Sequence, residues 1–456
     1  SSQSTVTDHL IEGLSQAEID LIKDETVTLN LSFYLGSNQT DDLIEMAADF
    51  EERYPNVTII LDRKQSDDSV VSEFKTNAFL SSKSDLILAD QDYLALATPL
   101  FSSIEAYSLS HAEIDGHIIG IDETVIEEDY FSIYDFEDEK VTFPFTRKSQ
   151  LIFANRDMMS QYATQLQTLD INVTNDGYLM SGFKLGFDDL QNIKTIYSSN
   201  PVLTLEDSYR TLSSWLYEVN GSLLNGSSYV INTQESRDFM SQLRTLSQTR
   251  VIDLASTYSS EAFNQEQTLL AVSDVESLRY MVTNSEFEVD IYPMIKLNDA
   301  SEFFYGYDFA INDYSSDAEK LYSWLFIRYA TDLNEHYLDF CINNGYSPIQ
   351  KLTLLQEYND YQNLLALFQD FYSSSGAPSW LGDDFDWTTL HYATIQRMYQ
   401  YMRTSIRPFM GFIDVNTNNI TTKRNAWQDA MESILYDNEL NSSFESISAR
   451  SFSLTF

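Results

Sequence analysis

Apolar and polar residues alternate along residues 27–33 with the period of a β-strand that buries one face. A polar loop, residues 34–40, contains Gly36 and follows this strand. Apolar residues then recur at helical spacing up to Phe50, with Thr40 or Asp41 able to cap the helix and Pro55 to end it. The β-branched run at 57–61 predicts a neighbouring parallel strand. Residues 27–61 are therefore predicted to form a βαβ unit.

A second step of the same kind follows. Residues 69–80 have helical periodicity, and residues 85–90 form a short apolar run that ends in Asp90. Two successive βαβ steps predict a doubly wound sheet, whose ligands bind at the carboxyl ends of its strands. We expect the 34–40 loop to form one wall of a ligand site and Asp90 to be a contact. The alternatives are an ordinary βαβ unit without a ligand, and an Asp90 that only caps the next helix.

Residues 141–159 form another informative stretch. They predict an extended crossing segment, a polar run at 146–149 and a short strand at 151–153. The run contains two of the chain's few basic residues, directly after nine acidic ones between Asp122 and Glu139. Arg147 is therefore a candidate ligand contact, and a salt bridge to the preceding acids is the alternative.

Composition limits the classes of function. The 456 residues include 70 acidic and 27 basic ones, a formal charge of −43 that argues against a nucleic-acid partner and against direct adhesion to anionic lipid. Cys341 is the single cysteine, so disulfides and multi-cysteine metal centres are excluded within this sequence. Nucleotide-binding, HExxH and GxSxG motifs are absent, and His336 stands alone in a helical stretch. We expect no cofactor, no metal and no catalytic residues.

A series of short motifs occurs in a characteristic order. It begins with Phe-Glu-x-x-x-Pro at 50–55, continues with an acid-ended strand after 84, and then has Pro-Phe at 144–145 before Phe-Ala-Asn-Arg-Asp at 153–157. Phe-Asp-Asp-Leu at 187–190 and Gly-Tyr-Ser-Pro at 345–348 follow. This order resembles the extracellular solute-binding proteins of ABC importers, family 1, of the maltose-binding-protein-like, sugar-type group. The resemblance covers about residues 26–350, with Phe187 where the family has Trp.

The resemblance implies an α/β, two-lobe periplasmic-binding-protein type II fold. Each lobe would be a mixed sheet flanked by helices, with the ligand cleft between the lobes. We expect an N-terminal tether at 1–25. Lobe 1 would comprise 26–143 plus 268–304, and lobe 2 would comprise 144–267 plus 305–456 with extra C-terminal helices. Aromatic residues near Trp380–Trp387 are expected to pack in the core, and a contact with the cleft is the alternative.

The resemblance also implies the function: an extracellular substrate-binding component that captures a mono- or oligosaccharide by lobe closure and delivers it to an ABC permease. It would be a monomer, lipid-anchored to the membrane through an N-terminal segment. Eight residues at predicted strand ends and helix starts are the candidate ligand contacts: Tyr34, Asn38, Asp90, Arg147, Trp215, Asp274, Glu276 and Tyr307.

Two alternatives stay open. The same fold could bind a peptide, a polyamine or another small polar solute, with Arg147 favouring an anionic group and Asp90, Asp274 and Glu276 a cationic one. The alternative of another class is a secreted glycoside hydrolase, which would need two carboxyl groups about 5–10 Å apart across a cleft. The sequence contains many acids but no recognisable pair of this kind.

Overall fold

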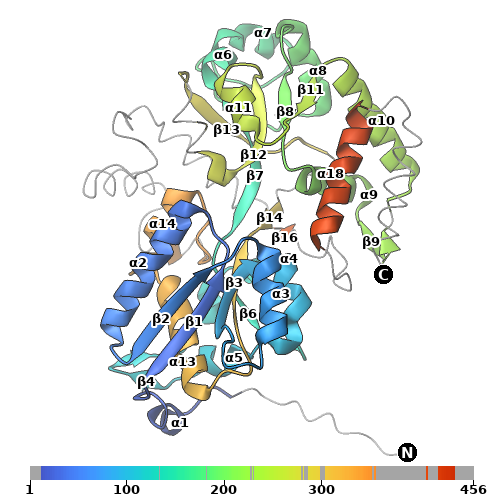
Figure 1. Ribbon diagram of the computed structural model, residues 1–456. Coiled ribbons are helices and arrows are strands. Elements are labelled where there is room, and N and C mark those ends of the chain that lie inside the picture. Colours follow the sequence, from blue (N-terminus) through green and yellow to red (C-terminus); the bar gives the residue numbers. More distant parts are fainter. Residues whose placement is uncertain are drawn as a thin grey trace, which may run out of the picture. The chain divides into compact units, whose positions relative to one another are not determined.

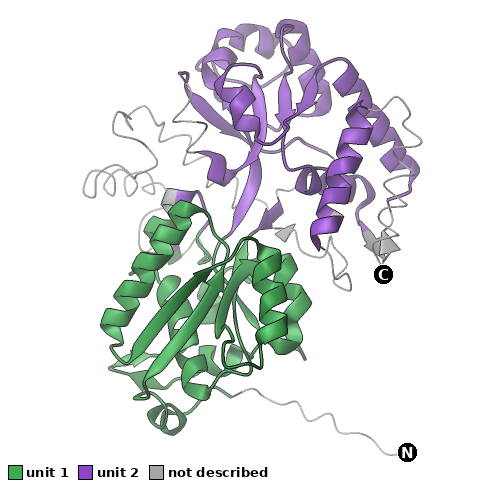
Figure 2. Ribbon diagram, viewed as in Figure 1, with its two compact units in different colours: residues 1–146, 306–340, 348–354 green, residues 147–305, 341–347, 355–456 purple. Residues whose placement is uncertain are grey.

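The chain divides into two compact units in a computed structural model (Figure 1, Figure 2). Unit 1 contains residues 1–146, 306–340 and 348–354, and unit 2 contains residues 147–305, 341–347 and 355–456. The structure describes residues 12–132, 134–180, 182–225, 228–229, 231–278, 281, 286–297, 303–351, 354–355, 407–408 and 420–436. The first eleven residues of the predicted tether and the predicted aromatic site at Trp380–Trp387 lie outside these ranges.

Unit 1 is built on a five-stranded sheet in the order β2-β1-β3-β15-β6. Strands β1 (Val27–Phe33), β2 (Val57–Arg63) and β3 (Leu86–Asp90) are parallel, whereas β15 (Tyr307–Ile311) runs antiparallel to both β3 and β6 (Thr142–Pro144). The alternation predicted for residues 27–33 matches β1, in which Val27, Leu29, Leu31 and Phe33 are buried. The predicted pair of βαβ steps is confirmed.

Helices cover both faces of this sheet. Helices α2 (Ser37–Arg53) and α13 (Asp317–Ala330) contact each other beside β1 and β2, and α3 (Asp67–Asn77) and α4 (Gln91–Leu94) lie against β3 (Figure 1). Helix α2 begins earlier than the sequence predicts, because Gly36 adopts an extended conformation and serves as its N-cap. The predicted 34–40 loop is thus reduced to residues 34–36.

The rest of unit 1 consists of short elements. Near the N-terminus, Ser15 caps α1 (Gln16–Asp20) with a capping box. The other short elements precede β6 in the chain: η1 (Ala95–Leu100), α5 (Glu105–Ser108), β4 (Glu113–Ile114), β5 (His117–Ile118), η2 (Glu123–Val125) and η3 (Glu128–Tyr130). Aromatic side chains, among them the edge-on pairs Phe50–Phe326 and Phe143–Trp324, fill the core of the unit.

The centre of unit 2 is the long strand β7 (Lys148–Asn155). One edge of β7 pairs antiparallel with β12 (Leu270–Asp274), which continues through β8 (Leu203–Leu205) to β11 (Ile252–Leu254). The other edge is shared by β14 (Phe303–Tyr305) near the start of β7 and β13 (Val289–Tyr292) near its end. The short strand β16 (Arg407–Pro408) extends the sheet beyond β14.

The helices of unit 2 flank this sheet. Helices α9 (Ser208–Asn220), α10 (Gln234–Gln248) and α18 (Ile420–Tyr436) form a mutually packed group. Arg244 of α10 donates hydrogen bonds to the carbonyls of Ser433 and Ile434, which satisfies acceptors in the last turn of α18. The remaining elements are α6 (Arg156–Gln161), α7 (Ala163–Thr168), α8 (Phe187–Ile196), β9 (Leu224–Asn225), β10 (Ser228–Tyr229), α11 (Ser259–Asn264) and η4 (Val275–Ser277).

The allocation of the return strands differs from the sequence prediction. Residues 268–304 were expected in lobe 1, but β12, β13 and β14 pair with β7 of unit 2. Residues 305–456 were all expected in lobe 2, but β15 pairs with β3 and β6 and α13 packs on β1. The reason is strand pairing: the buried residues of β15 lie between two partner strands of the first sheet, β3 and β6. The chain passes from unit 1 to unit 2 within helix α14 (Tyr337–Asn344).

Among the described residues, no helix combines the length and the apolar character that crossing a bilayer requires.

Candidate functional site

Unit 1 gathers polar side chains at the carboxyl ends of β1 and β3. Asp90 ends β3, is buried, and caps α4 by accepting a hydrogen bond from the Asp92 N–H at 2.9 Å. The backbone N–H of Asp90 donates to Oδ1 of Asp67 at 3.3 Å. The capping role of Asp90, which the sequence analysis gave as the alternative, is therefore present.

Tyr307 lies beside Asp90 in the same sheet. The two residues are register partners where β15 begins and β3 ends. The Tyr307 hydroxyl donates to Oδ2 of Asp67 at 3.3 Å, and its backbone N–H donates to Oγ1 of Thr146 at 3.0 Å. Gly306 permits this close approach, because a Cβ there would lie 1.8 Å from the Thr146 carbonyl oxygen. Two predicted site residues, Asp90 and Tyr307, thus come together with Asp67, which the sequence analysis did not single out.

Two glutamine side chains at this edge are buried with unpartnered polar atoms. Gln91 follows Asp90 and is 3% exposed, yet neither its Oε1 nor its Nε2 has a hydrogen-bond partner within the described part of the chain. Gln39, in the first turn of α2, is 6% exposed, and its Oε1 has no hydrogen-bond partner there either. A buried amide without a partner costs about 1–3 kcal/mol. Such groups are therefore candidates for contacts with a bound ligand.

The other two predicted residues of unit 1 lie at the end of β1. Tyr34 is half-buried in the short connection between β1 and α2. Asn38 lies in the first turn of α2 rather than in a loop, and it is also half-buried. Both positions are compatible with a role at the edge, and that role stays a prediction.

Unit 2 has a polar edge of a different kind, centred on Lys148 at the start of β7. Its Nζ lies 2.8 Å from Oε2 of Glu276 and 3.3 Å from Oδ2 of Asp274. Burial opposes the charge of Lys148, but the two carboxylates outweigh it and raise the lysine pKa above its ordinary value. Burial raises the pKa of Asp274, and Lys148 acts in the opposite direction. The predicted pair Asp274 and Glu276 is thus present at one place, held by a lysine.

Tyr305 provides a buried aromatic ring beside this ion pair. It pairs with Lys148 across β14 and β7, and the Lys148 Nζ lies 5.5 Å from its ring centroid. The guanidinium carbon of Arg210 lies 3.5 Å from the same centroid, which is a close cation–π contact. Burial raises the Tyr305 pKa well above its usual value. The Tyr346 hydroxyl donates a short hydrogen bond to Glu276.

Glu206 supports the edge of unit 2 through hydrogen bonds. Its carboxylate accepts hydrogen bonds from the Ser273 hydroxyl at 2.5 Å and from the Ser259 N–H at 2.6 Å. Burial nevertheless raises the pKa of Glu206, with these hydrogen bonds acting against the shift. Since Ser273 directly precedes Asp274 in β12, Glu206 fixes the strand that presents Asp274.

The structure corrects two predictions about unit 2. Trp215 is 3% exposed, and its ring packs edge-on against Phe187 at 5.3 Å and Phe239 at 6.0 Å, so it is a core residue of α9. Arg147 is fully buried, and its carbonyl accepts a hydrogen bond from the Ser347 N–H. The neighbouring Lys148 reaches the acidic pair.

The eight candidate contacts leave out five polar or aromatic residues of these edges: Gln39, Asp67, Gln91, Lys148 and Tyr305. Gln91 had been placed at the end of its strand and Tyr305 near a lobe edge from the sequence, but neither was selected. Two signals were available. Gln39 and Gln91 each follow a selected residue directly, and Lys148 is the second basic residue of the polar run that contains Arg147. Asp67 carried no comparable signal, because only the fold brings α3 to the end of β3.

Comparison with known proteins identifies the fold. No family model matches the chain, and no curated protein matches it in sequence. UgpB from Mycobacterium tuberculosis, solved in complex with glycerophosphocholine, is similar at 15% identity and a TM-score of 0.65, covering 93% of this chain and 97% of its own. An ABC substrate-binding protein from Listeria monocytogenes in complex with cycloalternan is similar at 11% identity and a TM-score of 0.66, with 95% and 100% covered.

A third solved structure is the extracellular solute-binding protein family 1 member from Alicyclobacillus acidocaldarius, at 10% identity and a TM-score of 0.66, with 95% of this chain and 99% of its own covered. The likeness extends over nearly the whole of each chain. This chain therefore has the two-lobe α/β fold of these solute-binding proteins, as the order of its sequence motifs predicted.

Proposed function

We propose that this chain is the extracellular substrate-binding component of an ABC importer and that its ligand is a carbohydrate. The observation that carries the proposal is Gln91, a buried amide at the carboxyl end of a parallel strand whose two polar atoms have no partner in the described part of the chain. Such strand ends are where open α/β sheets bind ligands. An amide offers one acceptor and two donors, which suits a sugar hydroxyl that both donates and accepts.

The other groups of the unit 1 edge fit the same ligand class. Asp90 and Asp67 supply carboxylate oxygens that accept from hydroxyls, and the hydroxyl of Tyr307 lies next to them. Tyr34 at the end of β1 supplies an aromatic ring. Sugar rings present apolar C–H faces, so a half-exposed ring and several oxygen acceptors form a suitable combination.

The unit 2 edge would contribute charge and shape. Lys148 offsets one of the two negative charges of Asp274 and Glu276, and carboxylate oxygens accept hydrogen bonds from ligand hydroxyls. Two structural neighbours bear on the carbohydrate assignment. The Listeria protein, described with cycloalternan, supports it more than UgpB, which is described with glycerophosphocholine. The proposed contacts are Tyr34, Asn38, Gln39, Asp67, Asp90, Gln91, Asp274, Glu276 and Tyr307.

A second candidate, a small cationic solute such as a polyamine, is favoured by one observation. Asp67, Asp90 and Asp92 lie together at the unit 1 edge, and the chain's net charge of −43 favours cations in general. A polyamine would pair with these carboxylates directly. The carbohydrate is preferred because the Gln91 amide has a donor as well as an acceptor without a partner among the described residues. A sugar hydroxyl can meet both, whereas an ammonium group only donates and would leave the amide donor unmet.

The remaining elements of the proposal follow from the importer role. The chain would work as a monomer, without catalysis, deliver its ligand to the transmembrane subunits of a permease, and be held at the cell surface by an N-terminal lipid anchor. A glycoside hydrolase would instead cleave aryl glycosides, and we expect no such activity.

Isothermal titration calorimetry with maltose, maltotriose, cycloalternan, glycerophosphocholine and spermidine tests the proposal. We expect a saturable heat with at least one oligosaccharide and none with spermidine. A saturable heat with spermidine alone would select the second candidate. If none of the saccharides, extended to a broad oligosaccharide panel, gives heat with folded protein, the carbohydrate proposal fails. Release of product from aryl glycosides would replace the binding role by an enzymatic one.

A further inference from the structure

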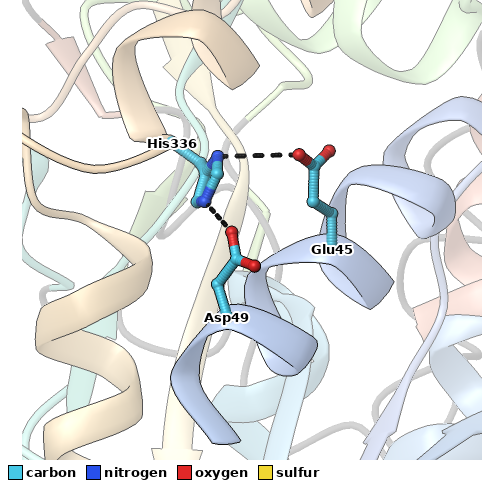
Figure 3. Close-up of side chains that lie close together, drawn as sticks. All are labelled: Glu45, Asp49 and His336. Carbon is cyan, nitrogen blue, oxygen red and sulfur yellow. Dashed lines mark ion pairs between the residues drawn. The ribbon is translucent and has the colours of Figure 1, made fainter. Parts of the chain in front are cut away.

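His336 lies between two carboxylates of helix α2 in unit 1 (Figure 3). Glu45 and Asp49 are one turn apart on α2, and His336 comes from the segment between α13 and α14, almost 290 residues later. Its Nδ1 lies 3.9 Å from Oε1 of Glu45, and its Nε2 forms a close ion pair with Asp49. The fold has thus joined a histidine that looks isolated in the sequence to two acidic side chains.

We propose that Glu45, Asp49 and His336 bind a divalent transition-metal ion of the Zn²⁺ type. Imidazole nitrogen and carboxylate oxygen are the ligands that Zn²⁺ takes besides thiolate. One ligand atom from each of the three residues lies within 4.8 Å of the other two. Because Zn²⁺ binds such atoms at about 2.0–2.2 Å, two of its ligands lie at most about 4.3 Å apart. Rotation of these half-buried and exposed side chains closes the remaining gap.

The imidazole makes the site selective. Ca²⁺ and Mg²⁺ prefer oxygen ligands alone, whereas imidazole suits zinc, nickel and copper. The His336 ring has a carboxylate near each nitrogen, so an ion bound to either nitrogen has a carboxylate ligand beside it. Water would complete the coordination, since Glu45 is exposed and the other two residues are half-buried.

The backbone around His336 is already held against α2. Glu335, its neighbour, pairs with Arg53 one turn beyond Asp49 at 2.5 Å, and the Arg53 guanidinium lies 4.9 Å from the ring centroid of Tyr329 at the end of α13. Two like charges four residues apart on a helix repel each other. A cation at this place relieves that repulsion, and the Arg53 contacts keep the histidine within reach. The bound ion would connect α2 to the turn between α13 and α14.

Metal titration of the full chain after treatment with EDTA tests the proposal. In calorimetry we expect one Zn²⁺ ion to bind per chain at this site. Bound Co²⁺ should give a visible d–d absorption band, which disappears when Zn²⁺ displaces the Co²⁺. His336→Ala should abolish the band, and Glu45→Gln or Asp49→Asn should weaken Zn²⁺ binding at least tenfold. The matched controls are Glu113→Gln and His117→Ala, an exposed acid and an exposed histidine elsewhere in unit 1, which should leave Zn²⁺ binding unchanged.

Three results would overturn the proposal: Zn²⁺ bound no more tightly than Ca²⁺ or Mg²⁺, a Co²⁺ band unaffected by His336→Ala, or no binding at all. Each of these would leave the three residues as an ion-paired cluster only. If His336→Ala does not fold, His336→Gln keeps much of the side-chain volume and removes the imidazole, and its circular dichroism spectrum verifies the fold. The result is independent of the carbohydrate proposal, because no ligand of the first site is added.

Discussion

The polar edges of the two units satisfy their hydrogen-bonding groups in opposite ways. In unit 1, Asp90 caps a helix, Tyr307 donates to Asp67, and two polar atoms of Gln91 have no partner among the described residues. In unit 2, Lys148 bridges Asp274 and Glu276. The first edge therefore retains unused hydrogen-bonding capacity, whereas the second consumes much of its capacity internally.

This difference separates two roles that both depend on polar residues. Unpartnered amides cost stability unless a ligand meets them, so they indicate binding. A partly buried ion pair chiefly holds the surrounding backbone in one arrangement, and removal of one member leaves an uncompensated charge. We therefore expect changes at the unit 2 edge to affect stability first and changes at the unit 1 edge to affect ligand affinity first.

The largest effect is expected for Lys148→Met. This change leaves Asp274 and Glu276 without their cation in a largely buried place, so the free energy of unfolding of unit 2 should fall by about 3 kcal/mol. Chemical denaturation measures it. Lys64 is a matched control, because it also bridges two carboxylates, Asp62 at 2.7 Å and Glu73 at 2.6 Å, and is as exposed as Lys148.

The carboxylates of the control pair are about half exposed, so Lys64→Met should cost less than about 1 kcal/mol. If the two lysine variants lose the same stability, the unit 2 edge is no more than a surface ion pair. The comparison between the two edges would then lose its basis.

The next effect is on ligand affinity. Gln91→Leu should weaken binding of the saccharide identified by calorimetry about tenfold or more, since a ligand hydroxyl loses its partner. Its stability should stay within about 0.5 kcal/mol of the unchanged protein or rise, because an unsatisfied amide is replaced by an apolar group. Gln150→Leu is the control, since this buried glutamine of unit 2 already donates to Thr211 at 3.1 Å.

For Gln150→Leu we expect the reverse pattern, a stability loss of about 1 kcal/mol with a smaller change in affinity. Calorimetry and denaturation on both variants test the pair together. Unchanged affinity in Gln91→Leu would remove Gln91 from the site. The weight of the carbohydrate proposal would then fall on Asp67, Asp90 and Tyr307.

The sequence predicted the first sheet well because its signals are local. Alternation in β1, helical spacing in α2 and the apolar run of β3 are patterns within one element, and each depends on burial in that element alone. The allocation of later strands depends on pairing between distant segments. Residues 270–274 and 307–311 are both short and apolar, so their patterns cannot tell which sheet each one joins.

The same limit applies to the candidate residues. Asp90, Tyr307, Asp274 and Glu276 were selected because they end strands or begin helices, and the fold places them in pairs. Trp215 was selected as an aromatic residue in a matching motif, but its side chain faces Phe187 and Phe239, since helical phase within α9 directs it to the core. Arg147 was selected from the polar run at 146–149, but β7 begins at its neighbour Lys148, and it is Lys148 that pairs with Asp274 and Glu276.

The smallest effect on stability is expected at Glu206. The pH dependence of the free energy of unfolding tests how this residue supports the unit 2 edge. Burial raises its folded-state pKa above the value of about 4.3 for an unfolded chain, so the folded state binds the proton more tightly. Its contribution to stability is therefore complete below that value and is lost as the pH rises through the raised pKa. Glu206→Gln carries no titrating group and should not show this loss.

The measurement is the difference in the free energy of unfolding between Glu206→Gln and the unchanged protein, followed from pH 4 to pH 8. The variant loses one acceptor for either Ser259 or Ser273, which shifts the whole curve by a constant amount. Above that offset, the variant should gain stability relative to the unchanged protein as the pH rises through the raised pKa of Glu206. Glu113→Gln, at an exposed strand, is the baseline. A flat difference would mean that Ser259 and Ser273 stabilise the charged carboxylate as strongly as burial opposes it, and that the unit 2 edge tolerates a third negative charge without cost.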